Sequence, residues 1–599
     1  MEDHGVIGDL YTTALIGLDG TIDYMCFPDF DSPTIFASLL DKDKGGFFKI
    51  YPVMQDINKS QMYLPDTNIL VTKFMAKEGI GEITDLMPVE KKEQAHNLIR
   101  RVTSIRGKIK FILECTPRFN YGLSKHRAES KNDDVFFHCH DEDGLVIKLK
   151  STIPLKIKDN DAYAEFVLNE GEHADFILEQ VKKGKPAIED TAEFVQEIME
   201  HTINFWQQWS EQCKYKGRWR EMVRRSALLL KLLTSRKYGS LIAAPTFGLP
   251  ERFDGTHNWD YRYTWIRDSS FTVYALMKMG YVDEAESFMH WVEKRCNDID
   301  EAGKLHLMYR LDGSHVPEER ELKHFEGYKK TKPVLIGNEA RSQIQLDIYG
   351  ELMDAIFLYD KHGKSPIFHD FWQNLIEQIN WVCDHWEEPD NSIWELRQTK
   401  QKYLFSRIMC WVAVDRAIRL AQKRSYPFPD KWNEVRDTIY NSVFEHFWDK
   451  KLNSFVQFIG AKSVDASMLL MPIVKFISPK DPKWLSTLDF IEKELVIDSL
   501  VLRYKAGKDG AEKKDSQNTF SVCSFWYIEC LSRAGELEKA RLAFQKMLGY
   551  CNRLGLYAEQ LSLQGRHMGN FPQALTHLGL IGAAYSLDKN LDAEREKQL

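Results

Sequence analysis

Residues 190–209 read DTAEFVQEIMEHTINFWQQW, and the pattern of the chain changes at this stretch. Its apolar residues share one side of a helix drawn through it, which predicts an amphipathic helix; they are Phe194, Ile198, Ile203 and Trp206. Many short strand-like runs precede this helix, whereas the residues after it are almost wholly helical in pattern. The sequence therefore predicts a multidomain β + α fold.

The first 190 residues contain the strand-like runs. Thr13 to Leu18, the turn Asp19-Gly20, and Thr21 to Cys26 indicate a hairpin, because Asp-Gly readily supplies the positive φ values of a type I′ turn. Further runs are Asn68 to Met75, Lys108 to Cys115, Val135 to His140, Leu145 to Lys150 and Ala162 to Leu168. Short strands without intervening helices predict an antiparallel sandwich.

The part after residue 210 predicts a helical domain. Candidate helices begin near Arg218, Asp268, Val282, Ala340, Phe368, Leu404, Lys431, Val464, Thr487, Thr519, Glu536 and Gln573. Twelve helices in six hairpins can close into a double-layered toroid, in which outer helices surround inner ones. An α-solenoid is the alternative, but no sequence period supports it. We expect a β-sandwich domain over 1–190, a helical linker over 191–216, a helical barrel over 217–590 and a charged tail over 591–599.

Composition limits the function. A net charge of -8 and a pI of about 6.2 argue against nucleic acid and anionic membranes as partners. No stretch approaches the ~20 apolar residues that cross a bilayer. The start, Met1 to Gly5, lacks the features of a secretory signal, and ten scattered cysteines indicate reduced thiols, so we expect a cytoplasmic protein. No metal-ligand spacing is convincing, and a homo-oligomer is left open.

Two lone glutamates lie in motif-dense surroundings, Glu395 in SIWELR (392–397) and Glu559 in LYAEQ (556–560). Two carboxylates, one protonated and one ionised, are the minimum machinery for splitting a glycosidic bond. The apolar neighbours of Glu395 favour a raised pKa and a general acid, whereas Glu559 beside Gln560 fits an ionised base that holds water. The alternatives are a surface glutamate and an ordinary glutamate at a helix end.

Residues 258–268 read NWDYRYTWIRD, with four aromatic, two arginine and two aspartate side chains. Arginine and aspartate together bind sugar hydroxyls as donor and acceptor, and aromatic rings offer flat faces, so this stretch favours sugar binding. The alternative for Asp268 is a helix N-cap. Arg503 is a further candidate, with a structural salt bridge as its alternative.

With these residues the chain resembles glycoside hydrolase family 15, the glucoamylase-type enzymes. The likeness is greatest to the two-domain prokaryotic-type branch that includes glucodextranases, isomaltose glucohydrolases and trehalases. It spans nearly the whole chain, and its motifs are Gly8-Asp9, residues 15–24, 28–33, 261–268, 337–338, 345–351, 393–395 and 569–573.

The resemblance implies an N-terminal antiparallel β-supersandwich followed by an (α/α)6 barrel that carries catalysis, without a cofactor or metal. It implies single-displacement hydrolysis with inversion, in which Glu395 is the general acid and Glu559 is the base that activates water. It places the substrate-binding residues at Tyr261, Trp265, Arg267, Asp268, Trp394 and Arg503.

The expected activity is exo-acting release of β-glucose from the non-reducing end of small α-glucosides of the isomaltose or maltose type. Trehalose hydrolysis is the alternative; a glycoside phosphorylase or a non-catalytic sugar-binding protein is less favoured. This chain departs from the branch at 516–520 and at Ala558 to Gln560, and the lysine-rich Lys505 to Lys514 predicts a longer loop near the leaving-group side. These departures leave the linkage open.

Overall fold

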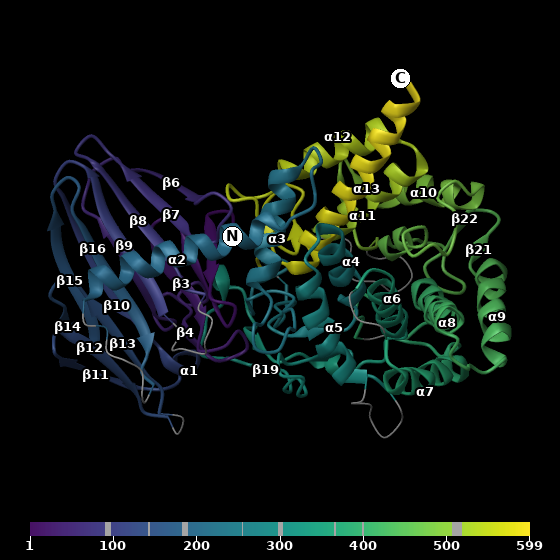
Figure 1. The fold of residues 1–599 in the computed structure, drawn as a ribbon, viewed down its shortest axis with the longest axis horizontal. Helices are drawn as coiled ribbons and strands as arrows, with labels where there is room; N and C mark the ends of the chain where they lie inside the picture. The colour runs from purple at the N-terminus through teal and green to yellow at the C-terminus, as the bar shows by residue number, and fades with distance from the viewer. Residues whose placement is uncertain are drawn as a thin grey trace.

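The computed structural model describes residues 1–89, 97–141, 144–182, 188, 190–253, 255–296, 304–363, 367–397, 400–505 and 518–598. Figure 1 shows a β domain built from the N-terminal part of the chain beside a helical domain built from the rest. The predicted β + α fold is confirmed.

Two eight-stranded antiparallel sheets form the first domain. The first sheet has the order β1 (His4–Gly8), β2 (Thr13–Gly17), β3 (Thr21–Cys26), β5 (Phe47–Pro52), β10 (Ile109–Thr116), β15 (Asp161–Leu168) and β14 (Lys156–Lys158), with β4 (Thr34–Phe36) beside β3. The second has the order β11 (His126–Lys131), β12 (Asp134–Cys139), β13 (Val146–Ser151), β16 (His173–Gln180), β9 (Asn97–Arg106), β8 (Ile80–Leu86), β7 (Leu70–Met75) and β6 (Asn58–Tyr63). A short helix, α1 (Phe119–Gly122), follows β10.

The first hairpin forms as predicted between β2 and β3, but the expected type I′ turn is wrong. Of the loop residues Leu18, Asp19 and Gly20, only Gly20 has a positive φ, at 81°. The N–H of Gly20 donates to the carbonyl of Gly17 at 3.0 Å, so the turn precedes a left-handed glycine, as in a three-residue hairpin loop. Asp19 is held instead by its ion pair with Lys49 at 2.8 Å.

Buried charged side chains connect the two layers of the sandwich. The strand pattern in the sequence did not predict them. Arg100 on β9 and Asp85 on β8 are fully buried and form an ion pair at 2.7 Å. The same guanidinium donates to the carbonyls of Phe48, on β5 of the other sheet, and of Gly20, in the loop between β2 and β3 of that sheet, each at 2.7 Å. Arg100 therefore joins the two layers through its side chain.

Helix α2 (Thr191–Glu211) covers the outer face of the second sheet. Asp190 caps it by accepting from the N–H groups of Ala192 and Glu193. Val195 packs against a separate apolar cluster of the sheet, made of Ile69, Leu86, Ile99 and Ile177. Strands β9 and β16 are thus buried on both faces and lack a clean alternation, which explains why the sequence did not reveal them.

The helical domain is an (α/α)6 barrel. Its helices are α3 (Arg220–Leu232), α4 (Ser269–Met279), α5 (Val282–Cys296), α6 (Asp347–His362), α7 (His369–His385), α8 (Leu404–Arg424), α9 (Lys431–His446), α10 (Pro482–Leu495), α11 (Ser521–Ala534), α12 (Leu537–Leu548) and α13 (Ala574–Gln598), with the 3-10 segments η1 (Tyr328–Lys330), η2 (Glu339–Ser342) and η3 (Ala466–Leu470). The inner ring runs α4, α6, α8, η3, α11, α13 and back to α4, and the remaining helices pack outside it.

Three expected helix starts differ from the structure. The start expected near Thr487 lies inside helix α10, which begins at Pro482 after the N-cap Asp481. Near Val464 the inner ring contains only the five-residue η3, because Pro472 follows it closely and cannot donate to a continuing α-helix. Near Ala340 the chain forms η2, and helix α6 begins at Asp347. Residues 591–598, expected as a charged tail, continue helix α13.

Short antiparallel pairs brace the loops between the helices. They are β17 (Thr264–Trp265) with β18 (Met308–Tyr309), β19 (Arg320–Glu321) with β20 (Leu335–Ile336), β21 (Trp448–Asp449) with β22 (Ser454–Phe455), β23 (Val496–Ile497) with β24 (Leu500–Val501), and β25 (Thr519–Phe520) with β26 (Gln560–Leu561) and β27 (His567–Met568).

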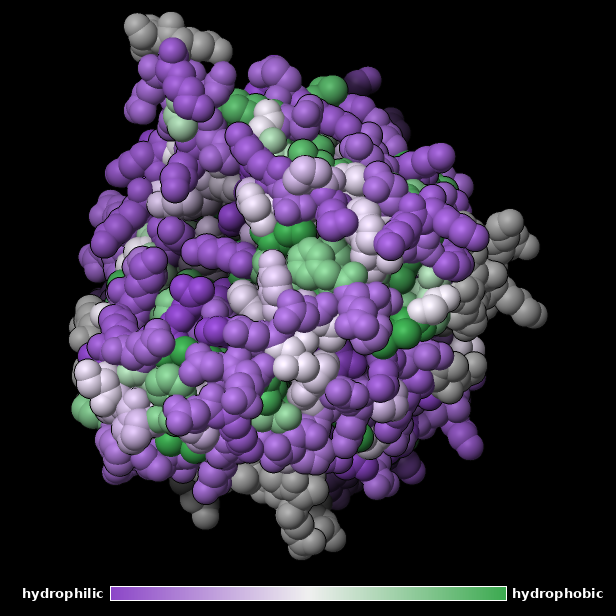
Figure 2. All heavy atoms as spheres, turned by 90° about the vertical axis from the view of Figure 1, so that its right-hand side faces the viewer, coloured by the Kyte–Doolittle hydropathy of each residue, from purple (hydrophilic) through white to green (hydrophobic). Residues whose placement is uncertain are grey.

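The outer surface of the helical domain is mostly hydrophilic on the face shown in Figure 2, and the hydrophobic residues drawn in colour there form small separate patches. Across the described part of the chain, no helix has both the length and the hydropathy required to span a membrane.

The buried Arg100–Asp85 pair generates a stability prediction. Arg100→Met leaves the Asp85 carboxylate buried without its partner, so we expect the free energy of unfolding to fall by about 3–5 kcal/mol. In the double variant Arg100→Met, Asp85→Leu, most of this stability should be regained. Urea unfolding of the full chain measures both, with Arg127→Met of the exposed Arg127–Glu129 pair as the control that leaves the midpoint unchanged. Equal losses in the single and double variants would contradict the role given to this pair.

Candidate active site

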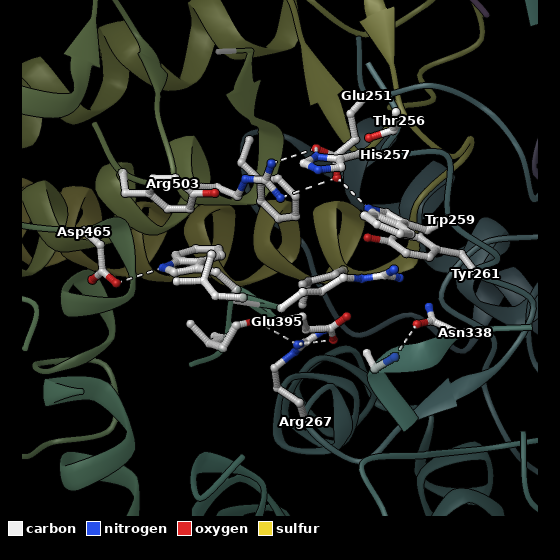
Figure 3. A pocket seen from close by; sticks show the side chains of 18 of the residues that line it. Glu251, Thr256, His257, Trp259, Tyr261, Arg267, Asn338, Glu395, Asp465 and Arg503 are labelled. Carbon is white, nitrogen blue, oxygen red and sulfur yellow. Dashed lines mark hydrogen bonds and ion pairs between the residues drawn. The ribbon is translucent and has the colours of Figure 1, made fainter. Parts of the chain in front are cut away.

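A cavity of about 700 Å³ lies among the loops that lead into the inner helices of the barrel. Figure 3 shows Glu395 and Arg267 on one side of it, with Glu251 and Arg503 across from them. All of its described lining residues belong to the helical domain, between Glu251 and Leu575.

Of the eight predicted site residues, five line this cavity: Tyr261, Arg267, Trp394, Glu395 and Arg503. The other three are buried behind it, and each is bonded to a lining residue. Trp265 donates to Glu395, Asp268 accepts from Arg267, and Glu559 accepts from Tyr261. The structure therefore brings all eight together.

Glu395 is held from one side by two donors. Trp265 Nε1 lies 2.8 Å and Arg267 Nη1 3.0 Å from Glu395 Oε1. The residue has φ 56°, in the left-handed region that non-glycine residues seldom occupy, and Gln343 Nε2 donates to its carbonyl at 3.1 Å. This strained turn and its bonds fix the carboxyl group at the wall of the cavity, where its side chain remains 21% exposed.

Arg267 also faces buried acids on its far side. Asp268 Oδ1 accepts from Arg267 Nε at 3.4 Å. Burial, together with the nearby charge of Asp390, raises the pKa of Asp347 to about 7, against the lowering effect of Arg267. The positive charge of the guanidinium therefore interacts with Asp268, Glu395 and Asp347 together. Of these three carboxyl groups, only Glu395 lines the cavity.

Glu559 is fully buried beneath Tyr261, whose hydroxyl donates to Glu559 Oε1 at 2.7 Å. The N–H of Asn570 lies 3.3 Å from Glu559 Oε2. A Cβ at Gly569 would stand 2.3 Å from the same oxygen, so the predicted turn at 569–573 requires glycine where it packs on the carboxyl group. The ring of Tyr261 lies edge-on to that of Trp265, at 5.4 Å, so adjacent aromatic side chains link the two glutamates.

A third carboxylate, Glu251, was missed by the sequence analysis. It is buried at the cavity wall and pairs with Arg503 Nη2 at 2.7 Å, while Trp259 Nε1 donates to it at 3.2 Å. It immediately follows Pro250, whose carbonyl accepts from Gly569 N–H at 2.8 Å. The one available signal was its position seven residues before the 258–268 stretch. The salt bridge that was the alternative for Arg503 is thus present, beside the cavity.

Glu251 and Glu559 lie in the same site, but their pKa values are shifted in opposite directions. Burial raises the pKa of Glu251, but Arg503 and His257 lower it more, so it lies below the usual range of a glutamate. Burial raises the pKa of Glu559 and the charge of Glu251 raises it further, against Tyr261 and Arg503. As the pH rises, Glu251 therefore ionises before Glu559, which keeps its proton to a higher pH. The sequence analysis expected an ionised Glu559.

The 258–268 stretch has two faces. Tyr261 faces the cavity, whereas Asp260 and Arg262 form a fully buried ion pair at 2.7 Å that points away from it. Arg262 Nη1 donates to the carbonyl of Ser32 at 2.8 Å, in the β domain. Half of the charged residues that indicated sugar binding thus join the two domains instead.

Trp394 lines the cavity, and its indole N–H donates to Asp465, another lining residue, at 2.8 Å. Burial raises the pKa of Asp465 to about 6, against this bond and that of Ser467. The bond fixes the tilt of the indole. The expected loop at Lys505 to Lys514 and the departure at Ser516 and Gln517 lie outside the described residues, apart from Lys505.

Among the described residues, no three His, Cys, Asp or Glu side chains are arranged so that they could hold a metal ion. The arrangement at the cavity is therefore one of paired carboxyl groups, arginines and aromatic rings. Such a set binds sugar hydroxyls and can move protons at a glycosidic bond.

Comparison with known proteins agrees with this geometry. Residues 217–585 match the family model described as Glycosyl hydrolases family 15, and residues 1–193 match Trehalase-like, N-terminal. The chain is 37% identical to a protein named Trehalase from Thermoplasma volcanium, over 99% of this chain and 94% of that one. It is 32% identical to a Trehalase from Mycobacterium tuberculosis, over 97% of this chain and 89% of that one.

The fold matches a solved bacterial glucoamylase complexed with acarbose, with a TM-score of 0.72 and 15% sequence identity over 98% of this chain and 94% of that one. This likeness supports the barrel and sandwich architecture. The family match covers most of the chain, and the similarity extends over 89–94% of the two relatives, so the protein is a glycoside hydrolase and belongs to glycosyl hydrolase family 15.

Proposed function

We propose that the protein is an α,α-trehalase that hydrolyses its substrate with inversion at the attacked carbon. The observation that carries the proposal is the full-length similarity to proteins named trehalase, which favours the alternative of the sequence analysis over its isomaltose- or maltose-type preference. The two glutamates in the expected positions, linked through Tyr261 and Trp265, supply the chemistry.

Glu395 is the proposed general acid. Trp265 and Arg267 both donate to Oε1, which leaves Oε2 to carry the proton toward the glycosidic oxygen. As the bond breaks, the carboxylate that forms is stabilised by the same two donors. These two donors thus stabilise the carboxylate that Glu395 becomes after the proton transfer. Before the transfer, they orient the carboxyl group and the proton that it carries.

Glu559 is the proposed base. It draws a proton from the water that attacks the anomeric carbon on the face opposite Glu395, and it does so only when ionised. Its raised pKa therefore sets the lower pH limit of activity: activity is lost as the pH falls through that pKa. A substrate hydroxyl that bonds to Glu251 or Arg503 changes this balance, because both act on the charge of Glu559.

Inversion predicts the products of trehalose hydrolysis. The attacked ring leaves as β-glucose and the departing ring remains α-glucose, so both anomers should appear in equal amounts before mutarotation. A proton NMR time course in phosphate-free buffer measures this. Early α-glucose alone would contradict inversion, and cleavage of maltose or isomaltose without cleavage of trehalose would contradict the substrate.

The roles of the two glutamates predict different leaving-group dependence. Glu559→Gln should lower kcat by roughly 10²–10⁴-fold on both trehalose and α-glucosyl fluoride, because each needs the activated water. Glu395→Gln should lower turnover of trehalose but spare α-glucosyl fluoride, since fluoride departs without a proton. Steady-state kinetics of both variants on both substrates measure this, and each variant is the control for the other. The same pattern in both variants would contradict the assignment of acid and base.

Glu251 predicts a shift in pH dependence. Glu251→Gln removes a negative charge that raises the pKa of Glu559 and frees Arg503, so that pKa should fall. The acidic limb of kcat/KM on α-glucosyl fluoride should move to lower pH by about one unit or more. Glu321→Gln, at the same cavity but without these contacts, is the control. An unmoved limb in Glu251→Gln would show that another group governs it.

A further inference from the structure

Arg397 lies two residues beyond Glu395 and lines the same cavity. The group that protonates a glycosidic oxygen lies within hydrogen-bond reach of the oxygen that leaves with the departing sugar, so the chain that continues from Glu395 to Arg397 lies close to that sugar. The cavity, at about 700 Å³, has the size of sites that hold drug-sized ligands, which includes a disaccharide.

The guanidinium of Arg397 is held in place by two neighbours from other loops. Nη2 lies 2.6 Å from Glu319 Oε2 and Nη1 lies 3.1 Å from Glu319 Oε1, a two-pronged ion pair. The guanidinium also stacks over the ring of Trp259, 4.2 Å from its centre. Glu319 is itself supported by the N–H of Glu339 at 3.4 Å. A side chain that is 40% exposed is thus fixed in a single orientation at the cavity wall.

Arg397 and Glu319 both line the cavity, and their ion pair leaves further donors and acceptors for a ligand there. A guanidinium has five N–H donors, and the ion pair uses two of them, while a carboxylate accepts at more sites than Arg397 fills. Donors and acceptors side by side match neighbouring sugar hydroxyls. Arg267, paired with Asp268 and Glu395, presents the same combination of an arginine and carboxylates, and Arg267 and Glu395 line the same cavity as Arg397.

The two rings of an α,α-1,1-linked disaccharide are chemically identical, and neither has a free anomeric hydroxyl. A site for that substrate must therefore satisfy the same ring hydroxyls twice. We infer that Arg397, braced by Glu319 and Trp259, binds the departing glucosyl unit and determines the preference for this disaccharide. The inference rests on the proposed trehalase function and names the residues that supply its second sugar site.

The test compares trehalose with α-glucosyl fluoride, which has no second sugar. In Arg397→Ala, kcat/KM for trehalose should fall about 10- to 100-fold, while that for the fluoride stays within about twofold. Arg397→Lys keeps the charge without the two-pronged geometry and should fall between wild type and alanine. Retained fluoride cleavage shows in the same experiment that each variant is folded.

Arg341→Ala is the matched control, because Arg341 pairs with Glu318 beside Glu319 and is not among the described lining residues. It should leave both substrates unaffected. If wild type cleaves trehalose and Arg397→Ala lowers both substrates equally or neither, the inference is overturned and the proposed function stands. If wild type cleaves the fluoride but not trehalose, the proposed function fails and the inference fails with it.

Discussion

The site depends on the buried ion pair between Asp260 and Arg262. Both side chains are at most 1% exposed, and Asp260 also accepts from Gly337 N–H and Tyr263 OH, each at 3.1 Å. Arg262 reaches across to the carbonyl of Ser32 in the β domain. A charge pair this deep is stable only with all of its bonds made, so it holds the backbone of residues 260–262 against the β domain. Tyr261 lies within this stretch and Trp265 follows it, and these two side chains contact the two glutamates.

Charge is the second constraint. Glu251, Glu395 and Glu559 all act on Tyr261, and two arginines serve the three carboxyl groups. Arg267 pairs with Glu395 and Arg503 pairs with Glu251. Glu559 accepts instead from the Tyr261 hydroxyl and the Asn570 N–H, and its pKa is raised. Of the three carboxyl groups, Glu559, the proposed base, is therefore the one without an ion pair to arginine, and a sugar bound to Arg503 or Glu251 changes the charge that acts on it.

Much of the architecture could be predicted from the sequence, because the change of period near residue 190 and the helix patterns are local properties. The eight proposed site residues could be named through the family resemblance, and the structure places them together. Strands β9 and β16 could not be predicted, since they are buried on both faces and carry Arg100, Arg101 and Asp175. Glu251, and the interdomain role of Arg262, depend on partners far away in the chain, such as Arg503 and Ser32, which no local pattern reveals.

The central claim is that Glu395 and Glu559 act from opposite sides of one glycosidic bond. The most direct test is a crystal structure of the Glu559→Gln variant with trehalose bound, in which the separation of the two side-chain carboxyl and amide groups is measured. The account predicts roughly 6.5–9.5 Å, with a water molecule between residue 559 and the anomeric carbon. A separation near 5 Å without room for water, or trehalose bound away from Glu395, would contradict it.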